Sequence, residues 1–312
     1  MSTCCDIRSF LIPVTRAMAV GFGAGVLYSM LEPYALVVRE FEVVMPDLPP
    51  AADGLKIAQL TDLHASAITP RSVVRRAVEI CNGLHPDVIV LTGDFVSRRN
   101  SYMKFTLARL WARPVMEYAK HLMDELKHLH APQGVYAVPG NHDHSKGNFG
   151  AIAELLKSAG IESLVNESVR LREVLPMIGL DDLRAGQPRV RRALQDIEPH
   201  QPHIILSHNP RLFSLLSCRN CLVLAGHTHG GQVHLPLTDF RRRPSDMQFA
   251  PWFRGWYRQN SSRMYVSSGV GSVHFPMRFR CPPEIAVFTL RVVPNTGSLK
   301  FLQRSETADI RL

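Results

Sequence analysis

Residues 55–64 read LKIAQLTDLH, an apolar run that ends in a polar Asp-x-His triplet. Four later segments have the same form, namely 88–94 VIVLTGD, 135–143 VYAVPGNHD, 204–209 IILSHN and 222–229 LVLAGHTH. Each apolar run is typical of a short, buried β-strand. Polar groups that can bind a metal ion follow each run at once. The chain therefore predicts a set of buried strands whose ends carry the chemistry.

The segments between these runs predict helices. In residues 70–84, the apolar side chains of Val73, Val74, Ala77, Val78 and Cys81 fall on one side of a helix. Further strands are predicted at 263–267 and 285–293. Strands that alternate with amphipathic helices indicate an α/β fold built in layers.

The N-terminal part of the chain differs from the rest. Residues 17–31 are uncharged and rich in Gly, Ala and Val, and they follow Arg8 and Arg16. This pattern is typical of a signal peptide or membrane anchor, although 15 residues are fewer than the ~20 that a span needs. The competing interpretation is a buried, Gly-rich helix of the main fold. Because Pro46, Pro49 and Pro50 indicate a linker, we assign residues 1–45 to an anchor-like or signal-like segment with its linker, 46–295 to the main domain and 296–312 to a polar tail.

Residues 99–130 indicate a helical insertion in this domain. Apolar side chains recur there at steps of three and four from Met103 to Leu129, and Pro114 is expected to kink or split the helix. One interpretation is a helix that packs on the core. The other is a lid or a membrane-facing pair of helices.

The polar strand ends predict a metal site. Ligands of open α/β sheets bind beyond the carboxyl ends of the strands, so the five ends can converge on one site. They offer carboxylates, imidazoles and one amide but no thiolate, a set that suits Mn, Fe, Zn or Mg better than a structural zinc. Seven ligands exceed the need of one ion and fit two ions that share a carboxylate. Because strand side chains alternate, we expect Asp62 and His64 to point to one side, and likewise His227 and His229.

The order D-x-H, G-D, G-N-H-D, a lone H and G-H-x-H resembles the calcineurin-like metallophosphoesterases over roughly residues 55–293. The resemblance implies a two-sheet sandwich flanked by helices and an enzyme in which a metal-bridging hydroxide attacks phosphorus. The first metal ion would be bound by Asp62, His64 and His229. The second would be bound by Asn141, His208 and His227, and Asp94 would bridge both. Mn is favoured as the cofactor.

The resemblance also implies roles beside the metals. His142, from the G-N-H motif, would stabilise the transferring phosphoryl group or protonate the leaving oxygen. Asp143 would orient His142, or would only form a local turn.

A narrower resemblance concerns residues 134–138, 179–182, 226–236 and 269–284. They are similar to a membrane-linked bacterial branch that includes phosphodiesterase-like proteins and the UDP-2,3-diacylglucosamine pyrophosphatases of lipid A synthesis. The implied substrate is lipid-linked, such as UDP-2,3-diacylglucosamine, and the implied location is the bacterial cytoplasmic membrane, on either side. The Arg-rich, aromatic stretch 240–280 indicates an anion-binding rim, in which Arg278 and Arg280 are expected to bind substrate.

The formal net charge of +9 suits an anionic partner such as phosphate, nucleic acid or a membrane surface. We find no DNA-reading motif and expect no nucleic-acid partner. The alternatives within the enzyme class are a phosphodiesterase that acts on phospholipids or nucleotides, and a protein phosphatase. The alternative outside it is a metal-binding scaffold of the same fold. Such a scaffold should have lost a ligand or the G-N-H histidine, and this chain has lost none.

Overall fold

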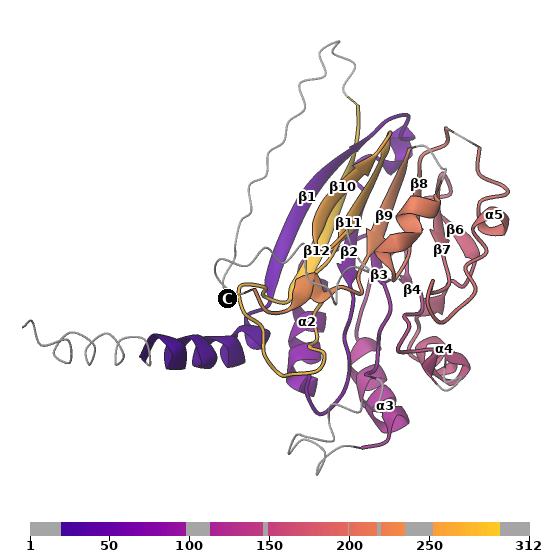
Figure 1. Ribbon diagram of the computed structural model, residues 1–312. Helices are drawn as coiled ribbons and strands as arrows, with labels where there is room; N and C mark the ends of the chain where they lie inside the picture. Colours follow the sequence, from indigo (N-terminus) through magenta and orange to yellow (C-terminus); the bar gives the residue numbers. More distant parts are fainter. Residues whose placement is uncertain are drawn as a thin grey trace, which may run out of the picture.

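The computed structural model describes residues 20–97, 113–145, 149–198, 200–216, 220–234 and 252–293. The strands in these ranges form two six-stranded sheets that pack face to face. Helices lie on the outer sides of the sheets (Figure 1). The expected α/β class, with two sheets flanked by helices, is therefore confirmed.

The first sheet has a parallel centre. In spatial order its strands are β1 (Val37–Met45), β12 (Glu284–Val292), β2 (Lys56–Leu60), β3 (Val88–Leu91), β4 (Val135–Ala137) and β5 (Glu162–Ser163). Strands β2 to β5 run parallel, whereas β12 is antiparallel to β2 and parallel to β1. The helices α2 (Arg71–Gly83), α3 (Val115–Leu126) and α4 (Phe149–Ser158) pack on its outer face.

The second sheet has the spatial order β10 (Gly255–Gln259), β11 (Ser262–Val266), β9 (Cys221–Ala225), β8 (His203–Leu206), β7 (Leu175–Gly179) and β6 (Glu167–Leu171). The four strands β11, β9, β8 and β7 are parallel, and an antiparallel strand closes each edge. Its outer face carries the short helix α5 (Val190–Ala193) and the 3-10 helix η6 (Pro210–Leu215).

The side chains of β3 show why the central strands are continuous apolar runs. Val88 and Val90 pack into the core between the two sheets, whereas Ile89 and Leu91 pack against the helices. A strand that is covered on both faces needs apolar side chains at every position. The parallel strands of both sheets end in one region, and the polar groups of the candidate site follow them there.

Most of the predicted elements are confirmed. The helix at 70–84 is α2, with the five expected side chains buried, and the predicted strands correspond to β2, β3, β4, β8, β9, β11 and β12. Residues 37–45, which the sequence analysis placed before the domain, form β1 and pair with β12 along its whole length. The folded domain therefore includes residues on the N-terminal side of position 46. Charged residues such as Arg39 and Glu42 hid this edge strand in the sequence.

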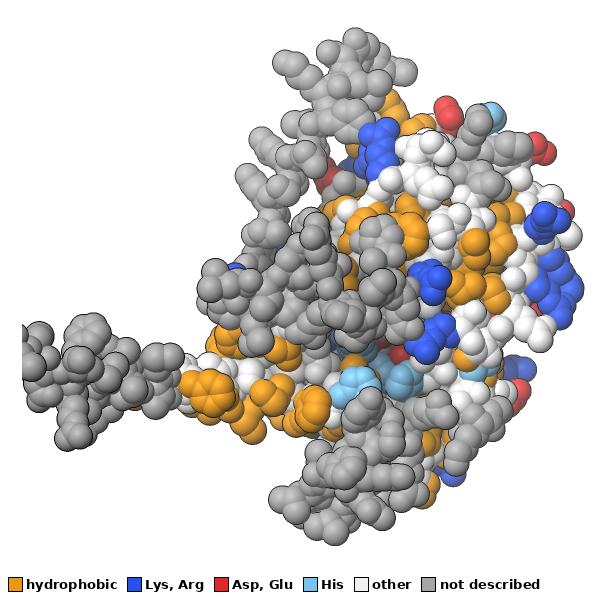
Figure 2. Space-filling model, in the orientation of Figure 1, with side chains coloured by type: hydrophobic (Ala, Val, Ile, Leu, Met, Phe, Trp, Pro, Cys, Tyr) orange, Lys and Arg blue, Asp and Glu red, His pale blue; other side chains and the backbone are white. Residues whose placement is uncertain are grey.

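Residues 20–31 form a helix that projects from the domain (Figure 1). Its apolar side chains are largely exposed, for example Phe22 at 77% and Leu27 at 60% (Figure 2). The interpretation as a buried helix of the main fold is therefore wrong for the described part. The base of the helix contacts the domain, where the N–H of Arg278 donates to the Ser29 carbonyl at 2.8 Å. Within the described residues, no helix has the length and apolar character that crossing a membrane requires.

The helical insertion is described from residue 113 onward, and Met103, Leu107 and Trp111 of its apolar stripe lie outside the described residues. Pro114 precedes the first turn of α3 rather than kinking it. Leu122 and Leu126 are buried against the first sheet's helical layer. The described part of the insertion is therefore a helix that packs on the core.

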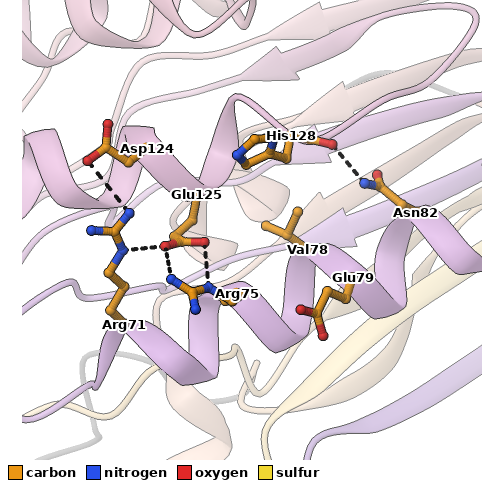
Figure 3. Close-up of a pocket in the computed structure, with 8 residues that line it drawn as sticks. All are labelled: Arg71, Arg75, Val78, Glu79, Asn82, Asp124, Glu125 and His128. Carbon is orange, nitrogen blue, oxygen red and sulfur yellow. Dashed lines mark hydrogen bonds and ion pairs between the residues drawn. The ribbon is translucent and has the colours of Figure 1, made fainter.

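An ion-pair group joins α3 to α2 beside a cavity of about 370 Å³ (Figure 3). The buried carboxylate of Glu125 accepts hydrogen bonds from Arg71 and Arg75, and Arg71 also approaches Asp124. The two arginines and the two carboxylates thus form ion pairs with one another. The cavity therefore reflects a contact between two helices and holds none of the strand-end residues.

Candidate metal centre

Five loops bring the predicted site residues together at the carboxyl ends of parallel strands. Backbone hydrogen bonds fix neighbouring loops to each other, because the N–H of His64 donates to the Asp94 carbonyl at 2.9 Å and that of Gly226 to the His208 carbonyl at 3.0 Å. The two sheets meet here as well. The N–H of His227, after β9, donates to the carboxylate of Asp62, after β2, at 2.9 Å.

The side chains form two clusters that share a border. One consists of Asp62, His64 and His229, and the other of Asp94, His208 and His227; in each, the candidate ligand atoms lie within 4.8 Å of one another. A third group of the same kind, made of His64, Asp94 and His142, overlaps both clusters. Oδ2 of Asp94 lies 3.4 Å from Nε2 of His64 and 3.3 Å from Nε2 of His208. Asp94 thus lies between the clusters, in the position expected of a bridging carboxylate.

The donor atoms fit divalent cations. Nε2 of His64, Nδ1 of His229 and Oδ1 of Asn141 are buried and have no hydrogen-bond partner in the described part of the chain. Such orphaned buried atoms are costly unless something else occupies them. Several imidazoles and carboxylates around them provide the mixed N and O set that suits Mn, Fe, Zn or Mg. The clusters are consistent with a centre of two metal ions.

Contacts behind the ligands set their orientation. Nδ1 of His208 donates to the Thr92 carbonyl at 2.8 Å, which leaves Nε2 as the ligating nitrogen. Nδ1 of His64 lies 3.1 Å from Oγ of Ser97. The Thr61 hydroxyl donates to Oδ2 of Asp62 at 2.8 Å. These contacts set the tautomer of His208 and hold the side chains of His64 and Asp62 in place.

Left-handed backbone turns, rather than strand alternation, aim the ligands. Strand β2 ends at Leu60, and the φ angles of Asp62 and His64 are 53° and 44°. His227 and His229 also have positive φ, at 75° and 52°. Asp62 and His64 do lie in one cluster, whereas His227 and His229 belong to different clusters. The expectation that strand periodicity aims these pairs is therefore wrong. Non-glycine residues adopt such φ values at a cost, and they concentrate at functional sites.

Two glycines allow the loops to approach this closely. A Cβ on Gly140 would lie 2.2 Å from Oδ1 of Asp94, and one on Gly226 would lie 2.3 Å from Oδ2 of Asp62. A side chain at either position would displace a candidate ligand. The G-N-H-D and G-H-x-H motifs therefore require glycine at these two positions, because the neighbouring carboxylates leave no room for a Cβ atom.

Burial and neighbouring charges shift the pKa values of the centre's residues in opposite directions. Burial raises the pKa of Asp62 and lowers those of His227 and His229 well below their usual values. For Asp94, burial is outweighed by the charges of His208 and His142, which lower its pKa well below the usual range. Against burial, the charge of Asp94 raises the pKa of His208 well above its usual value. The two shifts share a cause, since Oδ2 of Asp94 and Nε2 of His208 lie 3.3 Å apart.

His142 lies over the centre. Its N–H donates to Oδ1 of Asp94 at 2.8 Å, and its ring meets the His64 ring edge to face at 4.8 Å. Burial first, and then the charges of His64 and His208, lower the pKa of His142 to about 4, although Asp94 acts in the opposite direction. A neutral imidazole faces the clusters.

Asp143 has a role that the sequence analysis did not predict. Its fully buried carboxylate accepts hydrogen bonds from the backbone N–H groups of Gly140 and Asp94 at 2.8 Å and of Phe95 at 2.9 Å. Asp143 therefore holds the loop of the bridging Asp94 against the G-N-H-D turn, and its orientation of His142 stays a prediction. The other interpretation, a local turn, accounts for the hydrogen bond that Asp143 accepts from the Gly140 N–H. Burial and the charge of Asp94 raise its pKa to about 7.

The expectation that Arg278 binds substrate is wrong. Its side chain is 0% exposed, and its guanidinium donates to the carbonyls of Cys281, Ser268, Gly269 and Gly271. It stabilises the loop behind Asp62 from the inside. Arg280 is exposed and stays a prediction.

The wider anion-binding rim is mostly outside the described residues, which omit 235–251. Of its described aromatic residues, Trp252 lies edge to face with Phe213, and Trp256 packs with Phe41 and Phe288. These contacts pack both rings within the fold.

The sequence analysis used residues 179–182 only for the narrower resemblance and did not place the loop that follows β7 at the site. Nε2 of His144 lies 2.7 Å from Oδ1 of Asp181, which connects this loop to the G-N-H-D loop. Asp182 is also buried there. The Asp-Asp pair directly after an apolar strand was the available signal, since it has the same form as the five predicted strand ends.

The comparisons with known proteins agree with this geometry. The family described as Calcineurin-like phosphoesterase matches residues 55–231, a range that contains all seven predicted metal ligands. The chain is 30% identical over 295 residues to the uncharacterized metallophosphoesterase YkuE of Bacillus subtilis (strain 168), which covers 91% of this chain and 97% of that protein. It is 27% identical over 311 residues to the UDP-2,3-diacylglucosamine pyrophosphatase LpxG of Chlamydia trachomatis serovar D, with 82% and 90% covered. Among solved structures, TT1561 of Thermus thermophilus aligns at 14% identity with a TM-score of 0.43, over 69% of this chain and 89% of that one.

Proposed function

The chain belongs to the calcineurin-like phosphoesterase family, and from this premise we propose that it hydrolyses a phosphoanhydride or phosphodiester bond of a lipid-linked substrate, with UDP-2,3-diacylglucosamine as the leading candidate. The observation that carries the hydrolase assignment is the pair of buried His and Asp clusters that meet at Asp94. In this proposal Asp62, His64 and His229 would hold one ion, and Asn141, His208 and His227 would hold the other. Asp94 would contribute its carboxylate to both sites.

Two bound cations would neutralise the charge on the phosphate and lower the pKa of a water molecule to near neutrality. The protein's own part is to hold this charge in a buried, prearranged site. His142 supplies a neutral imidazole above the clusters, fixed by its backbone bond to Asp94. Its ring N–H is suited to hydrogen-bond an oxygen of the transferring phosphoryl group or of the leaving group.

Two observations support a lipid-linked substrate. The relative named UDP-2,3-diacylglucosamine pyrophosphatase LpxG covers 82% of this chain. The exposed apolar helix at 20–31 starts from the same surface as the loop 269–284, because Ser29 and Arg278 are hydrogen-bonded. We propose that this helix and the residues before it associate with a membrane, so that the metal centre lies near acyl chains.

The test compares kcat/KM for acylated and deacylated forms of the same UDP-sugar, using protein reconstituted with Mn²⁺. Binding energy from the acyl chains should appear as a higher kcat/KM for the acylated form. The Asp94→Asn variant, prepared in parallel, controls for contaminating hydrolases and should be inactive on both forms. Equal efficiency on both forms, or a preference for a water-soluble nucleotide diester, would contradict the lipid proposal and leave a phosphoesterase of another substrate class.

A further inference from the structure

The loop that contains Arg184 begins at the same sheet edge as the metal centre. It follows β7, which is the parallel neighbour of β8, and the N–H of Leu180 donates to the Leu206 carbonyl at 3.0 Å. His208 lies two residues beyond Leu206, and His227 follows the next strand, β9. The loop therefore emerges beside the cluster of Asp94, His208 and His227.

Buried carboxylates fix the backbone of this loop. Oδ1 of Asp182 accepts hydrogen bonds from the N–H groups of Arg184 and Ala185, both at 2.8 Å. Asp181 accepts from the N–H of Gln187 at 2.8 Å and lies 2.7 Å from Nε2 of His144. The position at which Arg184 leaves the loop is therefore set before any ligand binds.

The side chain of Arg184 is exposed. In the part of the chain that the structure describes, its guanidinium makes no ion pair, whereas Arg39, Arg71 and Arg291 each pair with a carboxylate. The nearby Asp182 carboxylate is 0% exposed and is committed to backbone N–H groups. Arg184 thus keeps a full positive charge and all its donors for another partner.

The loop of Arg184 also contacts the G-N-H-D loop of the centre, because Nε2 of His144 lies 2.7 Å from Oδ1 of Asp181. Figure 2 shows basic side chains next to the histidines that are visible on this face. A guanidinium can donate two parallel hydrogen bonds to phosphate oxygens, which makes arginine suited to a phosphate held at a fixed position.

We propose that Arg184 is a substrate-binding residue whose guanidinium holds an oxygen of the phosphate group bound at the metal centre, on the side of the loop that follows β7. This inference rests on the proposed function for the identity of the ligand. The loop geometry supplies the position, and the unpaired guanidinium supplies the charge.

The test measures the binding of inorganic phosphate to the Mn²⁺-loaded protein by calorimetry, together with kinetics on bis(4-nitrophenyl) phosphate. Arg184→Ala should weaken phosphate binding and raise KM by about tenfold to a hundredfold, as expected for the loss of a charge-assisted pair. Metal content and thermal unfolding should not change. Arg184→Lys should recover part of the loss, because lysine keeps the charge but not the fork of donors.

Arg189→Ala is the matched control, since Arg189 is an exposed arginine in the same connection, and it should behave like the wild type. Unchanged phosphate affinity in Arg184→Ala would overturn the proposal, and so would loss of metal or an absence of phosphate binding by the wild type. If the wild type hydrolyses no phosphoester but binds phosphate through Arg184, the proposed function fails while this inference stands. If the wild type hydrolyses phosphoesters but Arg184→Ala binds phosphate normally, this inference fails while the proposed function stands.

Discussion

The backbone N–H of His227 donates to both carboxylate oxygens of Asp62, at 3.1 and 2.9 Å. Asp62 follows a strand of the first sheet and His227 a strand of the second, and in our proposal they bind different ions. This pair therefore connects the sheets and the two clusters through one carboxylate. A shift between the sheets would change the distance between the clusters, so the packing of the sandwich determines the geometry of the centre.

Metal content tests the bridging position of Asp94. We expect the wild-type protein, reconstituted with Mn²⁺, to retain about two equivalents, as in other two-metal hydrolases. Asp94→Asn should lower retention sharply, because it removes the negative charge that lies between the two clusters. Elemental analysis after gel filtration gives the stoichiometry. Asp124→Asn, on the exposed side of α3, is the control and should retain both ions. A stoichiometry of one that Asp94→Asn leaves unchanged would contradict a binuclear centre.

His142 separates catalysis from metal binding. His142→Ala should retain both ions, since His142 is not among the proposed ligands, but turnover should fall by ~10²–10⁴-fold. Steady-state kinetics and metal analysis on the same preparation provide both values. His128→Ala is the control, because His128 lies beside the cavity between α2 and α3, which holds none of the strand-end residues. Loss of one metal equivalent in His142→Ala would identify His142 as a ligand, and wild-type turnover would exclude it from the mechanism.

The metal centre could be predicted from the sequence because its residues lie in short runs directly after apolar strands. The order of these runs identifies Asp62, Asp94 and His208 without any knowledge of their contacts. The burial of Arg278 could not be predicted, because it depends on four carbonyls that only the tertiary fold brings together. The charged edge strand β1 was also hidden, since half of it faces solvent.

Stability tests the structural role of Asp143. Asp143→Ala would leave the buried N–H groups of Gly140, Asp94 and Phe95 without an acceptor, and each such loss costs about 1–3 kcal/mol. We therefore expect the free energy of unfolding to fall by at least about 3 kcal/mol. Urea denaturation measures it. Asp143→Asn retains one acceptor oxygen and should lose less, whereas Asp196→Ala, on the surface, should be neutral. An Asp143→Ala variant as stable as the wild type would contradict this role.

The contact between His144 and Asp181 predicts a pH dependence of stability. Its hydrogen bond to Asp181 raises the pKa of His144, so this contribution is full below the ordinary imidazole pKa and disappears as the pH rises through the raised value. Burial opposes the shift of Asp181, but the bond to His144 lowers its pKa, so that contribution is full above the ordinary carboxyl pKa and disappears as the pH falls. The stability difference between the wild type and His144→Ala should therefore be largest at about pH 4 to 6.5. A difference that is constant from pH 3 to 9 would show that the charges do not contribute.

Membrane association should depend on the projecting helix and not on β1. Phe22, Leu27 and Leu31 expose 77%, 60% and 58% of their surface, and transferring such apolar surface from water into a bilayer is favourable by roughly 25 cal/mol per Å². A chain without residues 1–27 keeps Ser29 and its bond to Arg278, so it should fold, bind both metal ions and remain in the supernatant when vesicles of phosphatidylethanolamine and phosphatidylglycerol are sedimented. The full chain should sediment with them. A chain without residues 1–45 also loses β1 and its nine-residue pairing with β12, so it should unfold at a lower temperature than the shorter truncation. If the full chain stays in the supernatant, or if the chain without residues 1–27 sediments equally well, the helix and the residues before it are not the membrane contact.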